Sequence, residues 1–138
     1  MKIVIFFIAI NLISASFMKA QDTTGTGALA QKFLTLIGDF EYDKAIELMD
    51  TNVTGGSKKE TINKVLQYRQ QMFGSINSWK QYQSGIITKD GETRYTFRYN
   101  LQCVKGTSYD RIDIIRRGNE LKIIDYRFGT KDSAIDKN

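Results

Sequence analysis

Alternation of apolar and polar side chains is clearest in residues 93–104, whose sequence is TRYTFRYNLQCV. Apolar residues stand at every second position from Tyr95 to Cys103, with polar or charged residues between them. Successive side chains of a β-strand point to opposite faces of its sheet, so this period of two predicts a strand with one buried and one solvated face. Such strands are typical of an antiparallel sheet covered on one side.

Turn signals divide the C-terminal half of the chain into strands. They are Asp90-Gly91, Lys105-Gly106 and Gly118-Asn119. These dipeptides favour two-residue hairpin loops, so we predict four consecutive strands over residues 79–88, 93–104, 107–117 and 121–128. With loops of that length the register follows by counting, and most of the alternating apolar residues fall on one inner face.

The N-terminal half has the period of a helix instead. Apolar residues recur at spacings of three and four within 29–40, 42–49 and 62–76, which predicts three amphipathic helices. Gly38-Asp39 separates the first two, and Gly55-Gly56 precedes the third. We therefore expect an α+β fold, with N-terminal helices packed on a curved four-stranded antiparallel meander.

The first 20 residues have the pattern of a secretory signal peptide. Lys2 precedes an apolar run over residues 3–13, and small residues follow up to Ala20. We expect cleavage after Ala20, with Ala15 as the second choice, and a secreted or periplasmic location. The run is shorter than the roughly 20 apolar residues of a membrane span, so no stable span is expected after cleavage. Retention of the segment as an anchor is the alternative.

The rest of the chain is predicted to be one domain. We expect a flexible N-terminus at residues 21–27, the domain at 28–129 and a C-terminal tail at 130–138. A chain of this length, 138 residues with the signal segment, is long enough to bury a core without disulfides or metals.

Composition excludes several kinds of site. The chain has no histidine and one cysteine. A Ser-His-Asp triad, a Cys-His pair and a histidine-ligated zinc are therefore excluded, as is an internal disulfide. We predict no metal site and no cofactor. The excess of 20 basic over 15 acidic residues is small and scattered, so nucleic acid is not an expected partner.

The counted register leaves a few polar groups on the inner face. It places Tyr82 opposite Tyr99 and Asp110 opposite Arg127, with Asp125 nearby. An apolar environment raises the pKa of a carboxyl group, so Asp125 is a candidate general base, with Tyr99 or Tyr82 as a donor to an oxyanion. The alternative is a structural role, in which Asp110 and Arg127 form an ion pair. As ligand-binding residues we predict Tyr82, Tyr99, Asp110, Asp125 and Arg127.

Apolar residues also remain on the outer face of the predicted sheet. They are Ile87, Ile115, Ile124, Tyr126 and Phe128, with Trp79 beside them. A contiguous exposed apolar patch is typical of an interaction surface. We therefore predict that a homodimer forms through this face or that a partner docks on it. The alternative is a set of scattered exposed apolar side chains.

A family resemblance is carried by residues 33–49, FLTLIGDFEYDKAIELM, and residues 121–129, LKIIDYRFG. The first segment resembles the opening helix pair of the nuclear-transport-factor-two-like, or cystatin-like cone, superfamily. The second is similar to the closing strand of small secreted bacterial members. The resemblance spans roughly residues 28–129 and implies a cone-shaped fold, a pocket between helices and sheet, and frequent dimerisation through the sheet.

The resemblance leaves the function open, because members include enzymes, ligand-binding domains and structural domains. The leading hypothesis is a non-catalytic exported module that binds a small, partly apolar ligand in the cone or docks a partner on its sheet. The second is a structural or assembly protein of the envelope with a filled core. The third is a small lyase, isomerase or hydrolase that uses Asp125. The absence of histidine favours the non-catalytic interpretations.

Overall fold

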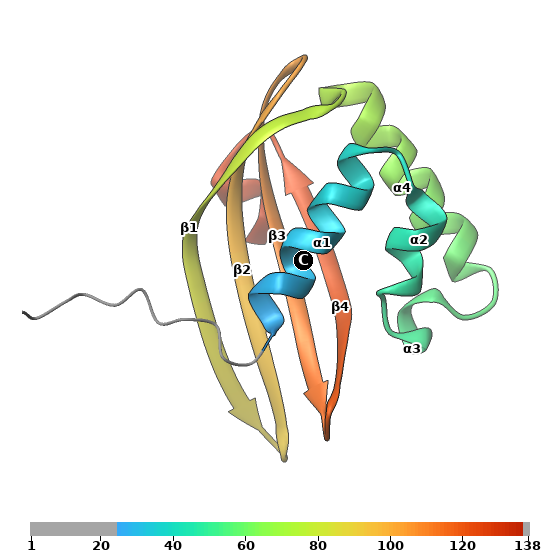
Figure 1. The fold of residues 1–138 in the computed structure, drawn as a ribbon, viewed down its shortest axis with the longest axis vertical. Helices are drawn as coiled ribbons and strands as arrows, with labels where there is room; N and C mark the ends of the chain where they lie inside the picture. The colour runs from blue at the N-terminus through green and yellow to red at the C-terminus, as the bar shows by residue number, and fades with distance from the viewer. Residues whose placement is uncertain (1–24, 137–138) are drawn as a thin grey trace, which may run out of the picture.

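The computed structural model describes residues 25–136, with helices first and strands after them (Figure 1). The predicted signal segment and its cleavage points lie outside these residues. The elements are α1 (Thr26–Gly38), α2 (Tyr42–Glu47), α3 (Thr51–Thr54), α4 (Lys58–Phe73), β1 (Ile76–Lys89), β2 (Glu92–Cys103), β3 (Gly106–Arg117), β4 (Glu120–Gly129) and the 3-10 helix η1 (Asp132–Asp136). The predicted α+β fold is confirmed, with two short helices more than expected, α3 and the C-terminal η1.

The sheet is an antiparallel meander in the order β1-β2-β3-β4. Figure 1 shows it curving around the helices, which cover its inner face, and α1 and α4 pack against its β2, β3 and β4 strands. The buried residues of α1 include Phe33, Leu34 and Ile37, one face of that helix. They meet inward-facing strand residues such as Ile112 and Ile123, which have no exposed surface. The apolar faces of the strands and of the amphipathic helices therefore pack against each other and form one core.

The β2–β3 turn lies one residue earlier than predicted. Cys103 is opposite Gly106, so the two-residue loop is Val104-Lys105. The register therefore shifts by two residues and places Tyr99 opposite Asp110 instead of Ile112. Because a shift by two preserves the side of the sheet to which each residue points, the inner face of β2 and β3 is the predicted one.

A β-bulge in β4 changes the predicted face of its second half. Ile114 is opposite Ile123, but Asp113 is opposite Asp125, so Ile124 is an extra residue on β4. One extra residue reverses the side to which all later residues point. Asp125 and Arg127 are consequently on the outer face, and their predicted inner position is wrong.

The same bulge brings two aromatic residues into the core. The Tyr126 ring is 5.0 Å from that of Phe33, and the Phe128 ring is 6.2 Å from that of Phe73. Of the other residues in the predicted outer patch, Ile115 is 3% exposed, whereas Ile87 is 64% exposed. The predicted apolar dimer patch is therefore wrong, because two of its residues belong to the interior and a third is covered.

A second irregularity lies in β1. Gln83 is opposite Arg98, but Gln81 is opposite Tyr99, so Tyr82 is the extra residue. The predicted pairing of Tyr82 with Tyr99 is wrong. Tyr82 is 40% exposed, and its hydroxyl donates a hydrogen bond to Asp132 of η1.

Within residues 25–136, the helices are all too short or too polar to cross a bilayer.

Candidate functional site

The residues predicted to line one pocket lie at two separate places. Tyr99 and Asp110 are fully buried between the helices and the sheet. Tyr82, Asp125 and Arg127 contribute to a charged and aromatic surface on the opposite side of the sheet. The predicted site residues therefore belong to two regions, an interior polar cluster and the outer face of the sheet.

The interior cluster is centred on the Asp110 carboxylate of β3. Arg69 of α4 places its Nε 3.2 Å from Asp110 Oδ2, and the Tyr126 hydroxyl donates to the same oxygen at 2.5 Å. The Ser108 hydroxyl donates to Asp110 Oδ1. Both charged partners are buried, with side-chain exposures of 3% for Arg69 and 0% for Asp110. A buried carboxylate with a cation and two hydroxyl donors has its charge well compensated.

Three groups of this cluster keep their ordinary protonation state at neutral pH. Burial, reinforced by Asp110, raises the pKa of Tyr126 well above its ordinary value, so its hydroxyl stays a donor. Burial also raises the pKa of the Cys103 thiol, although Arg69 Nη2 lies 3.7 Å from its sulfur. Burial lowers the pKa of Arg69, but its partners Tyr126 and Asp110 more than offset this, so its guanidinium stays charged. Neither Tyr126, Cys103 nor Arg69 titrates near pH 7.

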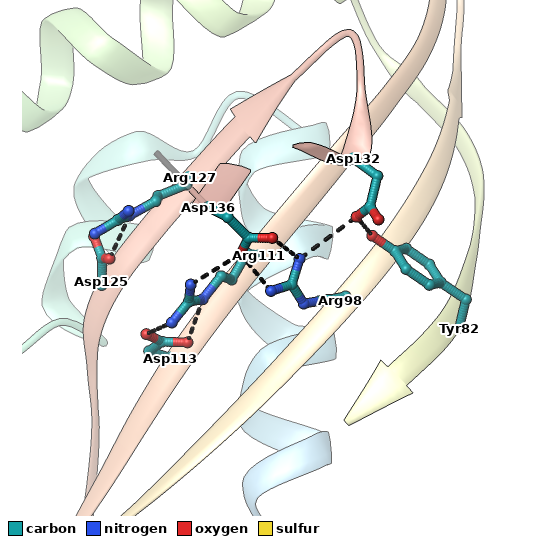
Figure 2. Close-up of polar contacts among 8 residues, drawn as sticks. All are labelled: Tyr82, Arg98, Arg111, Asp113, Asp125, Arg127, Asp132 and Asp136. Atoms are coloured by element: carbon teal, nitrogen blue, oxygen red, sulfur yellow. Dashed lines mark hydrogen bonds and ion pairs between the residues drawn. The ribbon is translucent and has the colours of Figure 1, made fainter. Parts of the chain in front are cut away.

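Across the sheet, the outer face has a row of arginines that Figure 2 shows together with their carboxylate partners. Arg98 of β2 is opposite Arg111 of β3, which is opposite Arg127 of β4. Like charges in such a row repel one another. Aspartates of the sheet and of η1 compensate them: Asp113, Asp125, Asp132 and Asp136.

Two strands of this outer network hold their own ion pairs. Arg111 donates from Nε and Nη2 to the two carboxylate oxygens of Asp113, at 3.0 and 2.9 Å. Arg127 Nε donates to Asp125 Oδ2 at 2.7 Å. Asp125 therefore has an arginine partner on the outer face and is not the predicted inner base beside Tyr99.

The C-terminal helix η1 is hydrogen-bonded to the same network. Asp136 accepts hydrogen bonds from both Arg98 and Arg111, and Asp132 accepts one from Tyr82. Ile135 between them has no exposed surface. These contacts hold the C-terminal segment against the outer face of the sheet.

Replacing Asp136 with asparagine tests this attachment. The hydrogen bond from Arg98 lowers the pKa of Asp136 below its ordinary value of 3.8. A carboxyl group with a lowered folded-state pKa stabilises the fold above its unfolded-state pKa, and this contribution disappears as the pH falls through the folded-state value. We expect Asp136→Asn to lower the Tm at pH 7 by no more than about 5 °C, because the pair is solvent-accessible.

Thermal melts at pH 7, 5 and 3 measure the effect. The Tm difference from the wild type should shrink between pH 5 and 3. Asp43→Asn is the control, because Asp43 is exposed and lies 3.8 Å from Lys59 in a pair remote from η1. A Tm difference that grows in acid would contradict the assigned role of Asp136.

A groove of about 490 Å³ lies beside this network. Its lining residues are Ser78, Trp79, Lys80, Tyr82, Asn100, Gln102 and Tyr109. Lys80, Asn100 and Tyr109 are directly opposite one another on β1, β2 and β3. The bulge sets the Tyr82 ring edge-on to that of Tyr109, with centroids 6.4 Å apart.

The polar groups of the groove are neutral hydrogen-bonding groups apart from Lys80. Gln102 Nε2 donates to Asn100 Oδ1 at 2.9 Å, which leaves further amide donors and acceptors for a ligand. Burial and the bond to Asp132 raise the pKa of Tyr82 to about 12, so its phenol remains protonated. This groove was not predicted from the sequence, although Tyr109, an aromatic residue at an outer position of a strand, was a signal for it.

A second, smaller pocket of about 370 Å³ also lies at the surface. It is lined by Ile87, Lys89, Asp90, Glu92, Arg94 and Ile115. Among the residues that the structure describes, no three acidic or cysteine side chains are grouped as metal ligands.

Neither a protein-family model nor a curated protein matches the sequence. A solved structure is similar, that of a designed nuclear-transport-factor-two-like protein with five substitutions. The similarity has a TM-score of 0.52 and covers 78% of this chain and 100% of the designed one, at 17% identity. The chain has the nuclear-transport-factor-two-like fold. The predicted resemblance is thus confirmed for the fold, whereas the function must be argued from the residues themselves.

Proposed function

We propose that this nuclear-transport-factor-two-like chain is an exported, non-catalytic module that binds a small, partly apolar ligand in its outer groove. The observation that carries the proposal is the groove of about 490 Å³ lined by aromatic and amide side chains. Aromatic rings offer apolar contact area, and amides offer both donors and acceptors, a combination typical of sites for small organic molecules. The proposed site therefore lies on the opposite side of the sheet from the pocket expected between helices and sheet.

The interior cluster supports a non-catalytic assignment. A general base must come within hydrogen-bond reach of the proton that it removes. Asp110 has no exposed surface, and its carboxylate already accepts hydrogen bonds from Arg69, Tyr126 and Ser108. Asp125, the predicted general base, lies on the outer face and accepts a hydrogen bond from Arg127.

Export is supported by the first 20 residues alone. A basic residue, an apolar run over residues 3–13 and small residues up to Ala20 are the three parts of a secretory signal. N-terminal sequencing of the protein recovered outside the cytoplasm would begin at Gln21 if cleavage follows Ala20.

Ligand binding is best followed by isothermal titration calorimetry, because Trp79, the only tryptophan in the chain, pairs with the buried Leu101 and so points to the inner side of the sheet. Native mass spectrometry first tests for a co-purified molecule. N-acetylglucosamine oligomers and phenyl glucoside then serve as probes, because each combines an apolar face with several hydrogen-bonding groups. We expect saturable binding, with a Kd between about 10 μM and 1 mM for so open a site.

Tyr109→Ala should weaken this binding by about tenfold or more, since it removes an aromatic wall of the groove. The matched control is Tyr68→Ala, because Tyr68 is 56% exposed on α4 and does not line the groove. Equal binding by the two variants would contradict the proposed site.

A structural or assembly protein is the second candidate. It is favoured by the interior cluster, in which Asp110 is enclosed by its own partners. A native mass equal to that of the chain alone, together with no measurable heat of binding for any probe, would contradict the binding module and favour this candidate.

A further inference from the structure

The two edges of the sheet differ in how their backbone groups are protected. At the β4 edge, the Asp50 amide donates to the Ile123 carbonyl at 2.8 Å, and the Ile123 amide donates to the Leu48 carbonyl at 3.0 Å. The connection between α2 and α3 thus blocks this edge. At the other edge, every residue of β1 from Asn77 to Lys89 is exposed. An open edge strand is a template for a further strand.

One part of β1 is uninterrupted and almost uncharged. It consists of residues 83–89, between the bulge at Tyr82 and the Asp90-Gly91 turn, and Lys89 is its only charged residue. Ile86 and Ile87 point to opposite faces of the sheet and are 69% and 64% exposed. Proteins commonly protect an edge with charges, prolines or bulges, and residues 83–88 contain none of these. Figure 1 shows this half of β1 extending beyond the helices.

We propose that residues 83–89 of β1 pair in antiparallel fashion with the same residues of a second copy of this chain. The interface would be isologous, with a two-fold axis perpendicular to the sheet, so that both copies keep their helices on the same side. All seven residues pair only if the two-fold axis passes midway between the two copies of the middle residue, Ile86. The two meanders then form one continuous eight-stranded sheet.

The charges of the edge agree with this register. Lys89 is opposite the uncharged Gln83 of the other copy, so no like charges face each other across the axis. The turn at Asp90 lies next to the segment of the other copy that contains Lys80. Opposite charges therefore come close at both ends of the paired segment. Ile86 is opposite its own counterpart, and Ile87 is opposite Gly85, so both isoleucines lose exposure to water.

The dimer is expected to be weak. A single strand pair is smaller than the roughly 1,200–2,000 Å² of a stable interface. We therefore expect a reversible monomer–dimer equilibrium with a Kd of about 10–500 μM, separate from ligand binding in the outer groove.

Analytical ultracentrifugation at protein concentrations from about 5 to 500 μM tests the proposal. The sample is the purified protein with the N-terminus that its expression host leaves. The weight-average mass should rise toward that of two chains. Ile86→Lys places two like charges opposite each other on the axis and should raise the Kd at least about tenfold. Val104→Lys is the matched control, because Val104 is 66% exposed in the β2–β3 turn. A monomer at every concentration, or equal dimerisation by the two variants, would overturn the proposal.

A cross-link tests the register without depending on a charge. Directly opposed residues of an antiparallel pair have Cα atoms about 4.5–5.5 Å apart, within the range of a disulfide. Ile86→Cys should therefore form a covalent dimer on mild oxidation, whereas Val104→Cys should not. Cys103 is buried and does not compete. Failure of Ile86→Cys to cross-link beyond the control would overturn the register centred on Ile86, whatever the result of the groove experiments.

Discussion

Asp110→Ala is expected to lower the free energy of unfolding by about 3–5 kcal/mol, the usual cost of removing one partner of a buried ion pair. The substitution leaves the Arg69 guanidinium, which is 3% exposed, without its carboxylate partner. It also removes the acceptor of the Tyr126 and Ser108 hydroxyls. Urea unfolding followed by circular dichroism measures the loss.

The double variant Arg69→Met, Asp110→Leu separates the charge from the packing. It replaces both charges by apolar side chains, a change that is often neutral or stabilising for a buried pair. We expect it to recover at least half of the stability lost by Asp110→Ala. A loss below about 1 kcal/mol for Asp110→Ala alone would show that the ion pair does not have the structural role assigned to it.

Deletion of Ile124 is expected to leave the native fold in place. Ile123 points inward, and without the extra residue Asp125 follows it directly. Asp125 and Arg127 therefore keep the outer face, and Tyr126 and Phe128 keep the inner face, in a strand that alternates regularly. Retained near-ultraviolet circular dichroism and cooperative urea unfolding would be the measured result.

Ile124→Ala is the control for this deletion. It keeps the backbone length and hence the bulge, and Ile124 is only half-buried. We expect it to cost no more than about 1.5 kcal/mol. A deletion variant that loses cooperative unfolding, while Ile124→Ala keeps it, would show that the end of β4 needs the bulge itself in order to pair with β3.

Much of the fold was predictable from periodicity. The period of two in residues 93–104 and the turn signals predicted the meander, because a sheet covered on one side requires alternation. Helical spacing in residues 29–40 and 62–76 predicted α1 and α4. The error of two residues in the β2–β3 register did not matter for the faces, so Tyr99 and Asp110 were correctly predicted to point inward.

The candidate site was predictable only where alternation was unambiguous. In β4, Ile123 and Ile124 are adjacent apolar residues, and both Tyr126 and Asp125 follow. The local sequence is therefore compatible with either face, and counting selected the wrong one. In β1 the residues are exposed on both sides, so no burial requirement sets the register and the bulge at Tyr82 left no trace in the apolar pattern.

Periodicity and composition alone thus defined the order of helices and strands, the inner face of β2 and β3, and the absence of histidine chemistry. The assembled tertiary structure decided which polar groups meet: Arg69 with Asp110, the arginine row with η1, and Tyr82 with Tyr109 at the groove. The physical reason is that alternation is a local property of a strand, whereas a bulge depends on contacts between distant elements. At β4 the bulge brings Tyr126 against Phe33, a packing contact between residues 93 positions apart that no local pattern contains.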